Sequence, residues 1–164
     1  MLSFDILISI MPKQAAGILV YKKKNRQLEI FLVHPGGPIH KNKDLAGWQI
    51  PKGEFESDEQ PFDAAKREFK EETGQEVDGK FIELKPVKYK SGKIVYAWAV
   101  EGEVDVNKIK SNLFSMEWPP KSGKQQEFPE VDRGEWFSIE QAKQKILPAL
   151  IPFIDELVEK LQKE

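Results

Sequence analysis

Two short apolar runs rich in β-branched residues lie near the start of the chain, over residues 16–21 and 28–33. Runs of this kind predict β-strands, and the polar residues 22–27 between them predict a hairpin connection. Residues 34–44 are punctuated by glycine and proline, which predicts a loop. A brief strand is predicted next, over residues 48–51.

A helical spacing follows this strand. Phe62, Ala65 and Phe69 recur at intervals of three and four residues, so they are expected on one buried face of an α-helix. Helix ends have their own signals in capping residues, proline and glycine. The residues predicted at the ends of this helix are Ser57 or Asp58 as the N-terminal cap, Pro61 in the first turn and Gly74 as the C-terminal cap.

The rest of the pattern completes an α+β domain. Strands first, one helix in the middle and helices at the end predict layers packed on a mixed sheet. The remaining predicted elements are strands near residues 80–89 and 93–101, a short helix within 105–114, a long loop over 117–129, a last strand over 135–138, and helices over 139–146 and 148–161.

Length and composition indicate the number of domains, the expected partners and the cellular location. A chain of 164 residues fits one domain, taken here as residues 11–164. The net charge of −2 gives no pull toward nucleic acid or an anionic membrane, so neither partner is expected. The absence of cysteine excludes disulfides, zinc–thiolate sites and thiol nucleophiles, and it fits a cytoplasmic location. The oligomeric state, monomer or homodimer, stays open.

The first ten residues are set apart from this domain. They are apolar but include Asp5, and no basic residue leads them, so they are interpreted as neither a signal peptide nor a membrane anchor. No apolar run approaches the roughly 20 residues that span a bilayer. Three interpretations of residues 1–10 remain: an N-terminal extension, an extra edge strand, or a consequence of where the start codon is placed.

The candidate chemistry lies on the predicted central helix. Glu68, Glu71 and Glu72 are three and four residues apart, a spacing that puts all three carboxylates on one helix face. Crowded acids repel one another, and a hard divalent cation turns that repulsion into binding. Oxygen ligands without cysteine or histidine favour Mg²⁺ or Mn²⁺, ions that most often act on phosphates. Just before the helix, Lys52 is suited to contact a phosphate, and Gly53 lets the backbone approach a metal or substrate closely.

The acids belong to a longer gapped pattern. It consists of Gly53, five residues, Glu59, seven residues, an arginine and a glutamate, two further residues, two glutamates, one residue and a final glycine. This segment resembles the Nudix box, G-x5-E-x7-R-E-U-x-E-E-x-G-U, where U is a bulky aliphatic residue. Two positions depart from it. Phe69 keeps apolar bulk at the first U, whereas Gln75 stands where the last aliphatic is expected, a change that Val77 is placed to compensate.

The resemblance extends beyond the box. Residues 15–19 resemble the family's Ala-Gly-containing first strand, and Pro51-Lys52-Gly53 resembles its entrance to the box. A prokaryotic subgroup of predicted nucleotide pyrophosphohydrolases shares the His-Pro-Gly-Gly-Pro sequence at His34, the Trp-Pro-Pro at Trp118 and the Phe-Pro-Glu-Val-Asp at Phe128. Membership implies a Nudix fold, an α/β/α sandwich around a mixed β-sheet, and a hydrolase that depends on Mg²⁺ or Mn²⁺.

The resemblance also implies residue roles. Glu71 and Glu72 would bind the metal, Glu68 would bind metal or act as base, and the backbone near Gly53 would add a ligand. Family members often carry one more glutamate several residues before a tryptophan-led strand, and Glu130, six residues before Trp136, fits best. The remaining implied roles are an ion pair between Arg67 and Glu59 that orients the acids, and Glu127 and Glu135 as weaker matches to the late glutamate.

Five further residues are candidates for binding substrate, each with a plainer alternative. Trp48 is placed to stack on a base or to fill the core or its rim. His34 and His40 lie in the glycine- and proline-rich loop, where they would touch substrate or simply be exposed. Lys121 and Lys124 lie in the long loop over 117–129, where they would close on a polyphosphate or only aid solubility.

The expected activity is cleavage of a pyrophosphate bond in a nucleoside diphosphate linked to another group. The entrance Trp48-x-x-Pro51-Lys52-Gly53-Glu54 resembles that of dinucleoside polyphosphate hydrolases, which makes such compounds the first expected substrates. A nucleoside triphosphate pyrophosphohydrolase is the next alternative, and inositol-pyrophosphate or RNA-cap activity is more distant. The alternative from another class is a catalytically silent Nudix domain that binds a nucleotide as a regulator.

Overall fold

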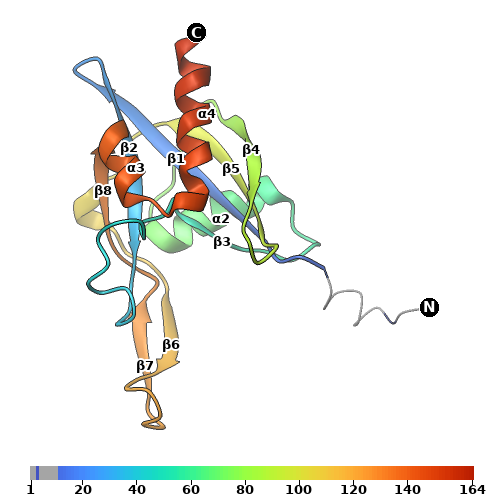
Figure 1. Cartoon of the computed structure of the whole chain (residues 1–164), viewed down its shortest axis with the longest axis vertical. Coiled ribbons are helices and arrows are strands. Elements are labelled where there is room, and N and C mark those ends of the chain that lie inside the picture. Colours follow the sequence, from blue (N-terminus) through green and yellow to red (C-terminus); the bar gives the residue numbers. More distant parts are fainter. Residues whose placement is uncertain (1–2, 4–10) are drawn as a thin grey trace.

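A computed structural model describes Ser3 and residues 11–164 of the chain. The question of the first ten residues therefore lies outside the described residues, apart from Ser3. Figure 1 shows a central sheet with helices on both of its faces. The elements are β1 Gln14–Lys24, β2 Gln27–Pro35, β3 Lys52–Glu54, α2 Pro61–Thr73, β4 Ile82–Lys88, β5 Ile94–Glu101, the 3₁₀ turn Val106–Lys108, β6 Leu113–Glu117, β7 Gln125–Pro129, β8 Val131–Ser138, α3 Ile139–Lys145, the 3₁₀ turn Pro148–Leu150 and α4 Ile151–Gln162.

The main sheet has the strand order β4-β5-β1-β2-β8, with β3 paired to β1. The pairing of β1 with β5 is parallel and the other pairings are antiparallel, so the sheet is mixed as predicted. Strand β1 lies at its centre and is buried from Ala15 to Tyr21. Because strand residues alternate between faces, β1 serves two separate cores.

The two cores lie on opposite faces of the sheet. Ala15 and Leu19 belong to the cluster covered by α3 and α4, whereas Ala16 and Ile18 belong to the cluster covered by α2. Both clusters hold large side chains that are almost completely buried, such as Trp48 in the first and Phe31 in the second. This helix–sheet–helix layering confirms the predicted α+β sandwich.

The ends of α2 agree only partly with the sequence prediction. Gln60 is the N-terminal cap and makes no side-chain capping bond, so the prediction of Ser57 or Asp58 as the cap was wrong. Pro61 occupies the first turn, where its missing N–H costs nothing. Gly74 ends the helix with φ of 74°, and its N–H donates to the Lys70 carbonyl at 2.8 Å. The glycine prediction is confirmed.

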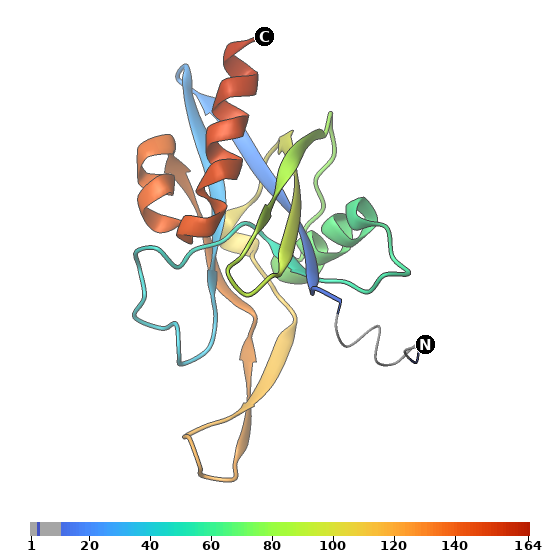
Figure 2. The same cartoon turned by 45° about the vertical axis from the view of Figure 1, so that its right-hand side comes forward.

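The segment between β5 and β8 departs most from prediction. The helix expected within residues 105–114 is reduced to the 3₁₀ turn Val106–Lys108. The long loop expected over residues 117–129 is instead a hairpin of β6 and β7, which pair from Leu113 with Pro129 to Glu117 with Gln125. Figures 1 and 2 show this hairpin projecting away from the main sheet. A two-stranded arm buries little apolar surface, so its sequence lacks the alternation that predicts strands.

Two predicted strands also have different boundaries in the structure. The strand expected over residues 135–138 begins earlier, at Val131. The strand expected over residues 48–51 is reduced to isolated bridges from Trp48 to Ile146 and from Gln49 to Val33, and the regular strand follows at β3. Within the described part of the chain, no helix has the length and hydropathy needed to cross a bilayer.

Strand β3 depends on a close approach at Gly17. A Cβ atom added at Gly17 would lie 2.5 Å from both the Pro51 carbonyl oxygen and the Lys52 Cβ atom. We expect Gly17→Ala to destabilise the protein by about 1–3 kcal/mol, because β3 must move away from β1. Urea denaturation would measure the loss. Gly47→Ala is the matched control, since its added Cβ meets only the flexible Lys43 side chain; an equal loss in both variants would contradict this explanation.

Candidate active site

Helix α2 carries its acids beside its buried face. Ala64, Ala65 and Phe69 pack into the core between α2 and the sheet, which fixes the rotation of the helix about its axis. That rotation places Glu68 almost entirely inside, at 7% exposure, with Glu71 and Glu72 half-buried. The apolar stripe thus holds the carboxylates against the sheet.

Arg67 binds three carboxylates. Its Nε and Nη2 atoms donate to the two carboxylate oxygens of Glu59 at 2.9 and 2.8 Å, the two-point geometry in which arginine pairs best. Its Nη1 atom donates to Glu68 at 2.7 Å and to Glu71 at 3.1 Å. The predicted ion pair between Arg67 and Glu59 is therefore present, and it anchors a guanidinium that also neutralises part of the acid cluster.

Strand β3 approaches α2 at Gly53. In the pairing of β1 with β3, Gly53 lies opposite Ala16, whose side chain belongs to the core under α2. A Cβ atom added at Gly53 would lie 2.0 Å from a Glu68 carboxylate oxygen. Only glycine leaves room for that carboxylate against the backbone. One residue earlier, the Lys52 N–H donates to Glu72 at 3.2 Å.

Glu130 joins the cluster from the segment between β7 and β8. Its N–H donates to the Asn112 carbonyl at 2.9 Å, and the Asn112 N–H donates to the Glu71 carbonyl at 2.8 Å. The Gly36 N–H donates to the Glu130 carbonyl at 2.9 Å. The backbone of Glu130 is thus held by the segment that docks on the end of α2 and by the end of β2.

The carboxylates influence one another's protonation. Burial raises the pKa of Glu68, and the charges of Glu71 and Glu130 add to the rise while Arg67 opposes it. Burial and the Glu71 charge likewise raise the pKa of Glu130. Burial raises the pKa of Glu72 to about 8, with further contributions from Glu68 and Glu130. The mutual effect shows that the late glutamate and the helix acids share one electrostatic environment.

Lys52 lies on the other face of the sheet from the helix acids. It pairs with Gly17, one position along from the pair that faces α2, so its side chain points toward the α3–α4 side. There its ammonium lies 5.8 Å from the centre of the Tyr89 ring. Burial, together with the charge of Lys93, lowers the pKa of Lys52 to about 8. The Glu72 charge partly opposes this shift, so the lysine remains electrostatically coupled to the acids.

The residues present fit a hard divalent cation in their chemistry. Carboxylate oxygens of four glutamates and the bare backbone at Gly53 are the donor types that Mg²⁺ and Mn²⁺ take. Among the described residues, no group of three or more His, Asp or Glu side chains is arranged as a ready metal site. Arg67 Nη1 occupies oxygens of both Glu68 and Glu71 in this arrangement. The predicted donors for such a cation, which stay a prediction, are Glu68, Glu71, Glu72, Glu130 and the backbone at Gly53.

Trp48 and His34 are not available to a substrate in this arrangement. Trp48 is 1% exposed and packs edge-to-face on both His34 and Phe137, which makes it a core residue. His34 is fully buried, and both of its ring nitrogens contact protein atoms, on Asp132 and on Lys43. The loop signal placed His34 near the site, and the position of Trp48 beside the entrance to the box did the same for Trp48. Neither signal indicates the direction of a side chain.

The predicted lysines lie elsewhere. Lys121 and Lys124 are exposed near the tip of the β6–β7 hairpin, which extends away from α2 in both views (Figures 1 and 2). Their role in closing on a polyphosphate stays a prediction. Of the other late acids, Glu127 is exposed on the hairpin and Glu135 is exposed on β8, so Glu130 is the one that joins the cluster.

The departure of Gln75 from the family pattern has a structural counterpart. Its side-chain amide donates to the Asp105 carbonyl and accepts from the Asp105 N–H, both at 2.9 Å. Val77 packs against the core under α2, as predicted for the residue that compensates. Sequence reasoning missed Asn112, which acts through its backbone and therefore leaves no side-chain signal.

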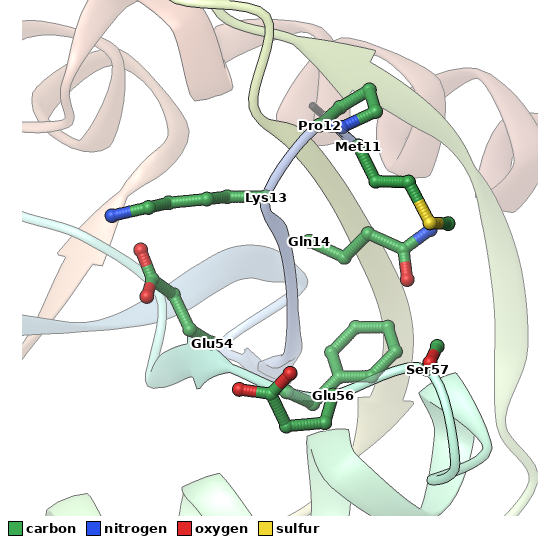
Figure 3. A pocket seen from close by; sticks show the side chains of 8 residues that line it. Met11, Pro12, Lys13, Gln14, Glu54, Glu56 and Ser57 are labelled. Atoms are coloured by element: carbon green, nitrogen blue, oxygen red, sulfur yellow. The ribbon is translucent and has the colours of Figure 1, made fainter. Parts of the chain in front are cut away.

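One pocket touches the clustered acids, and another lies beyond the end of β3. A pocket of about 190 Å³ touches Glu72 and Glu130 and is lined also by Val33, Pro35 and Gln49. A pocket of about 290 Å³ lies beyond the end of β3, where the Lys13 and Glu54 side chains extend toward each other (Figure 3). None of the clustered glutamates lines the larger pocket, so the smaller one is the pocket of these two that adjoins the acid cluster.

Comparison with protein families identifies the architecture. The model of the NUDIX domain matches residues 11–159, so the chain belongs to this family. The match supports its assignment as a pyrophosphohydrolase. A comparison with curated proteins finds no match.

Solved structures share the fold. An Ap4A hydrolase from C. elegans, in a binary complex, is 21% identical with a TM-score of 0.61, covering 93% of this chain and 99% of its own. The NUDIX domain of NrtR from Shewanella oneidensis, complexed with ADP ribose, is 13% identical with a TM-score of 0.64, covering 98% and 99%. A Nudix hydrolase from M. smegmatis, RenU, is 17% identical with a TM-score of 0.58, covering 92% and 86%. At these identities the likeness concerns the fold.

The raised pKa of Glu72 predicts a stability cost in the metal-free protein. Its folded pKa of about 8 exceeds the ordinary 4.5, so the folded state favours the protonated form. The stability contributed by that form is complete below about pH 4.5 and is lost as the pH rises through 8. Glu72→Gln removes the cost, because glutamine is neutral throughout. We expect the variant to melt about 2–4 °C above wild type at pH 8 in a chelator, and at nearly the same temperature at pH 4.5.

Thermal denaturation at several pH values measures this difference. Glu76→Gln is the control, since Glu76 is exposed and outside the cluster. A Glu72→Gln advantage that does not grow with pH would contradict the electrostatic explanation.

Proposed function

We propose that this chain is a divalent-metal-dependent hydrolase that cleaves a pyrophosphate bond in a nucleoside diphosphate linked to another group. The observation that carries the proposal is the convergence of Glu68, Glu71, Glu72 and Glu130 in one electrostatic environment beside Gly53. Such mutual repulsion costs stability in the free protein, and a cation bound between phosphate and protein relieves it.

The chain's own residues have distinct roles in this proposal. Glu71 and Glu72 hold the cation together with the backbone at Gly53. Glu68 or Glu130 accepts the proton of the attacking water as general base; both have raised pKa values, which bring them closer to the working pH. A bound divalent cation supplies the charge that neutralises phosphate oxygens and lowers the pKa of water.

Arg67 keeps this arrangement in order. Its two-point pair with Glu59 fixes the position of the guanidinium. The Glu68 and Glu71 carboxylates are therefore oriented by their ion pairs with a positive charge that is itself held in place. Lys52 adds positive charge at the entrance, on the sheet face where its ammonium lies near Tyr89. It is the candidate to contact a phosphate remote from the helix acids.

Dinucleoside polyphosphates are the first proposed substrates. The entrance sequence from Trp48 to Glu54 supports this choice, and an Ap4A hydrolase is among the structures of similar fold. Nucleoside triphosphates are the alternative within the same chemistry. The absence of cysteine supports a cytoplasmic location for the enzyme.

A catalytically silent nucleotide-binding regulator is the competing function. One structure of similar fold is a NUDIX domain complexed with ADP ribose. The complete set of box acids in this chain favours the enzyme, because a protein that only binds nucleotide has no need of a general base.

The proposed activity is tested by Glu72→Gln. We expect kcat/KM to fall about 100-fold or more with Mg²⁺ or Mn²⁺, since a charged cation ligand is worth several kcal/mol in the transition state. Wild type and variant are incubated with dinucleoside polyphosphates, nucleoside triphosphates and ADP-ribose in ¹⁸O-labelled water. Mass spectrometry of the products gives the substrate class and the phosphorus attacked.

The same variant is expected to be more stable than wild type without metal, so its loss of activity would not reflect unfolding. Glu76→Gln is again the control and should retain wild-type turnover. Near-wild-type turnover in Glu72→Gln would rule out the proposed role of this residue. Nucleotide binding without turnover in wild type would favour the regulator.

A further inference from the structure

Strand β8 contains a bulge at Asp132. In its pairing with β2, His34 lies opposite Arg133 and Pro35 lies opposite Val131, so Asp132 has no partner across the ladder. A bulge inserts one extra residue on one strand and re-aims the side chains beyond it. Here the residue beyond the bulge, toward the start of β8, is Val131, and Glu130 comes immediately before it.

The bulge changes which face of the sheet the start of β8 presents. Val131 and Trp136 pack in the same core, under α2, although five residues separate them. In a regular strand, residues an odd number apart face opposite sides. Phe137, six residues from Val131, packs in the other core. The bulge therefore places Val131, at the start of β8, on the side of the sheet that α2 covers. That helix carries the other three acids.

His34 holds the bulged residue in place. Its Nδ1 atom lies 2.9 Å from Asp132 Oδ1, and its Nε2 atom lies 2.8 Å from the Lys43 carbonyl oxygen. A carboxylate and a carbonyl only accept hydrogen bonds, so the buried ring bridges acceptors on two different segments of the chain. The Asp132 side chain is 30% exposed.

Other charged groups surround this pair. Arg133 donates to Asp132 at 3.4 Å, and its guanidinium lies 5.0 Å from the centre of the Trp48 ring. Asp44, next to the carbonyl that His34 binds, accepts from Lys145 on α3 at 2.6 Å. The bulge, the loop after β2 and helix α3 are thus joined around the buried His34 ring.

The bulge is connected to Glu130 through the backbone. Gly36, two residues after His34, donates to the Glu130 carbonyl at 2.9 Å. A Cβ atom at Gly36 would lie 2.0 Å from the Pro129 carbonyl oxygen, so the two chains are in direct backbone contact there. A shift of the bulge would be transmitted across this contact to Glu130.

We propose that His34 and Asp132 are positioning residues, which hold the β8 bulge and thereby aim Glu130 at the acids of α2. Neither side chain touches the reacting groups; both act through the backbone around Gly36. The kinetic part of this inference rests on the proposed hydrolase function, whereas the structural part does not.

The test compares Asp132→Ala with Asp132→Asn. Alanine removes the acceptor for His34 Nδ1, whereas asparagine keeps one. We expect hydrogen exchange of the Gly36 amide to accelerate at least tenfold in Asp132→Ala and to stay near wild type in Asp132→Asn. The amide of Gly102, which donates to the Tyr21 carbonyl elsewhere in the fold, should exchange at the wild-type rate in both.

The kinetic arm uses Glu130→Gln as a second background. We expect Asp132→Ala to lower kcat about 10- to 100-fold with little change in KM, because a catalytic group is misplaced. In the Glu130→Gln background the same substitution should cost less than threefold, since the residue that it positions is already disabled. Asp155→Ala, an exposed acid on α4, is the control for loss of a carboxylate.

Wild-type Gly36 exchange in Asp132→Ala would overturn the proposal. An undiminished loss of kcat in the Glu130→Gln background would overturn it too, by showing that Asp132 acts through another group. If wild type hydrolyses no polyphosphate, the proposed function fails and with it the kinetic role, while the exchange results still decide whether the contact between His34 and Asp132 holds the bulge.

Discussion

Crowding of like charge is the constraint around which this molecule is arranged. Glu68 lies against the bare backbone of Gly53 with no room for another side chain between them, and the charges of Glu71 and Glu130 act on it. Left alone, such a cluster would push α2 away from the sheet. The apolar stripe of the helix, the Arg67 guanidinium and the close approach of β3 to β1 all oppose that separation. The fold thus keeps the acids together at a cost in stability, as expected where function sets the arrangement.

The box and its helix were predictable because side-chain identity carries their chemistry. Charges at fixed helical spacing indicate both the helix and the type of ligand, so Glu68, Glu71 and Glu72 were found together. The ion pair between Arg67 and Glu59 was implied by the resemblance to the Nudix box, and it is present. The layered fold followed from apolar runs with clear periods. These signals are local, and a single sequence states them directly.

Other parts of the site depend on contacts that leave no such signal. The register of β8, and with it the place of Glu130, is set by a bulge that no periodicity announces. Asn112 acts through its backbone, so its side chain says nothing of its role. Trp48 and His34 were found near the site, but the packing that turns them inward involves Phe137 and Asp132, both about a hundred residues away in the chain. Long-range packing sets the direction of these side chains, whereas the local sequence pattern indicates only that they lie near the site.

The base of the β6–β7 hairpin has a consequence for how this protein can change over evolution. Asn112 joins the carbonyl of Glu71 to the N–H of Glu130, so the two ends of the hairpin are tied into the acid cluster. The far end around residues 118–124 is exposed and extends away from the body (Figure 2). Length and composition there are free to diversify, or to accept a grafted peptide, while the root of the arm is tied to the chemistry.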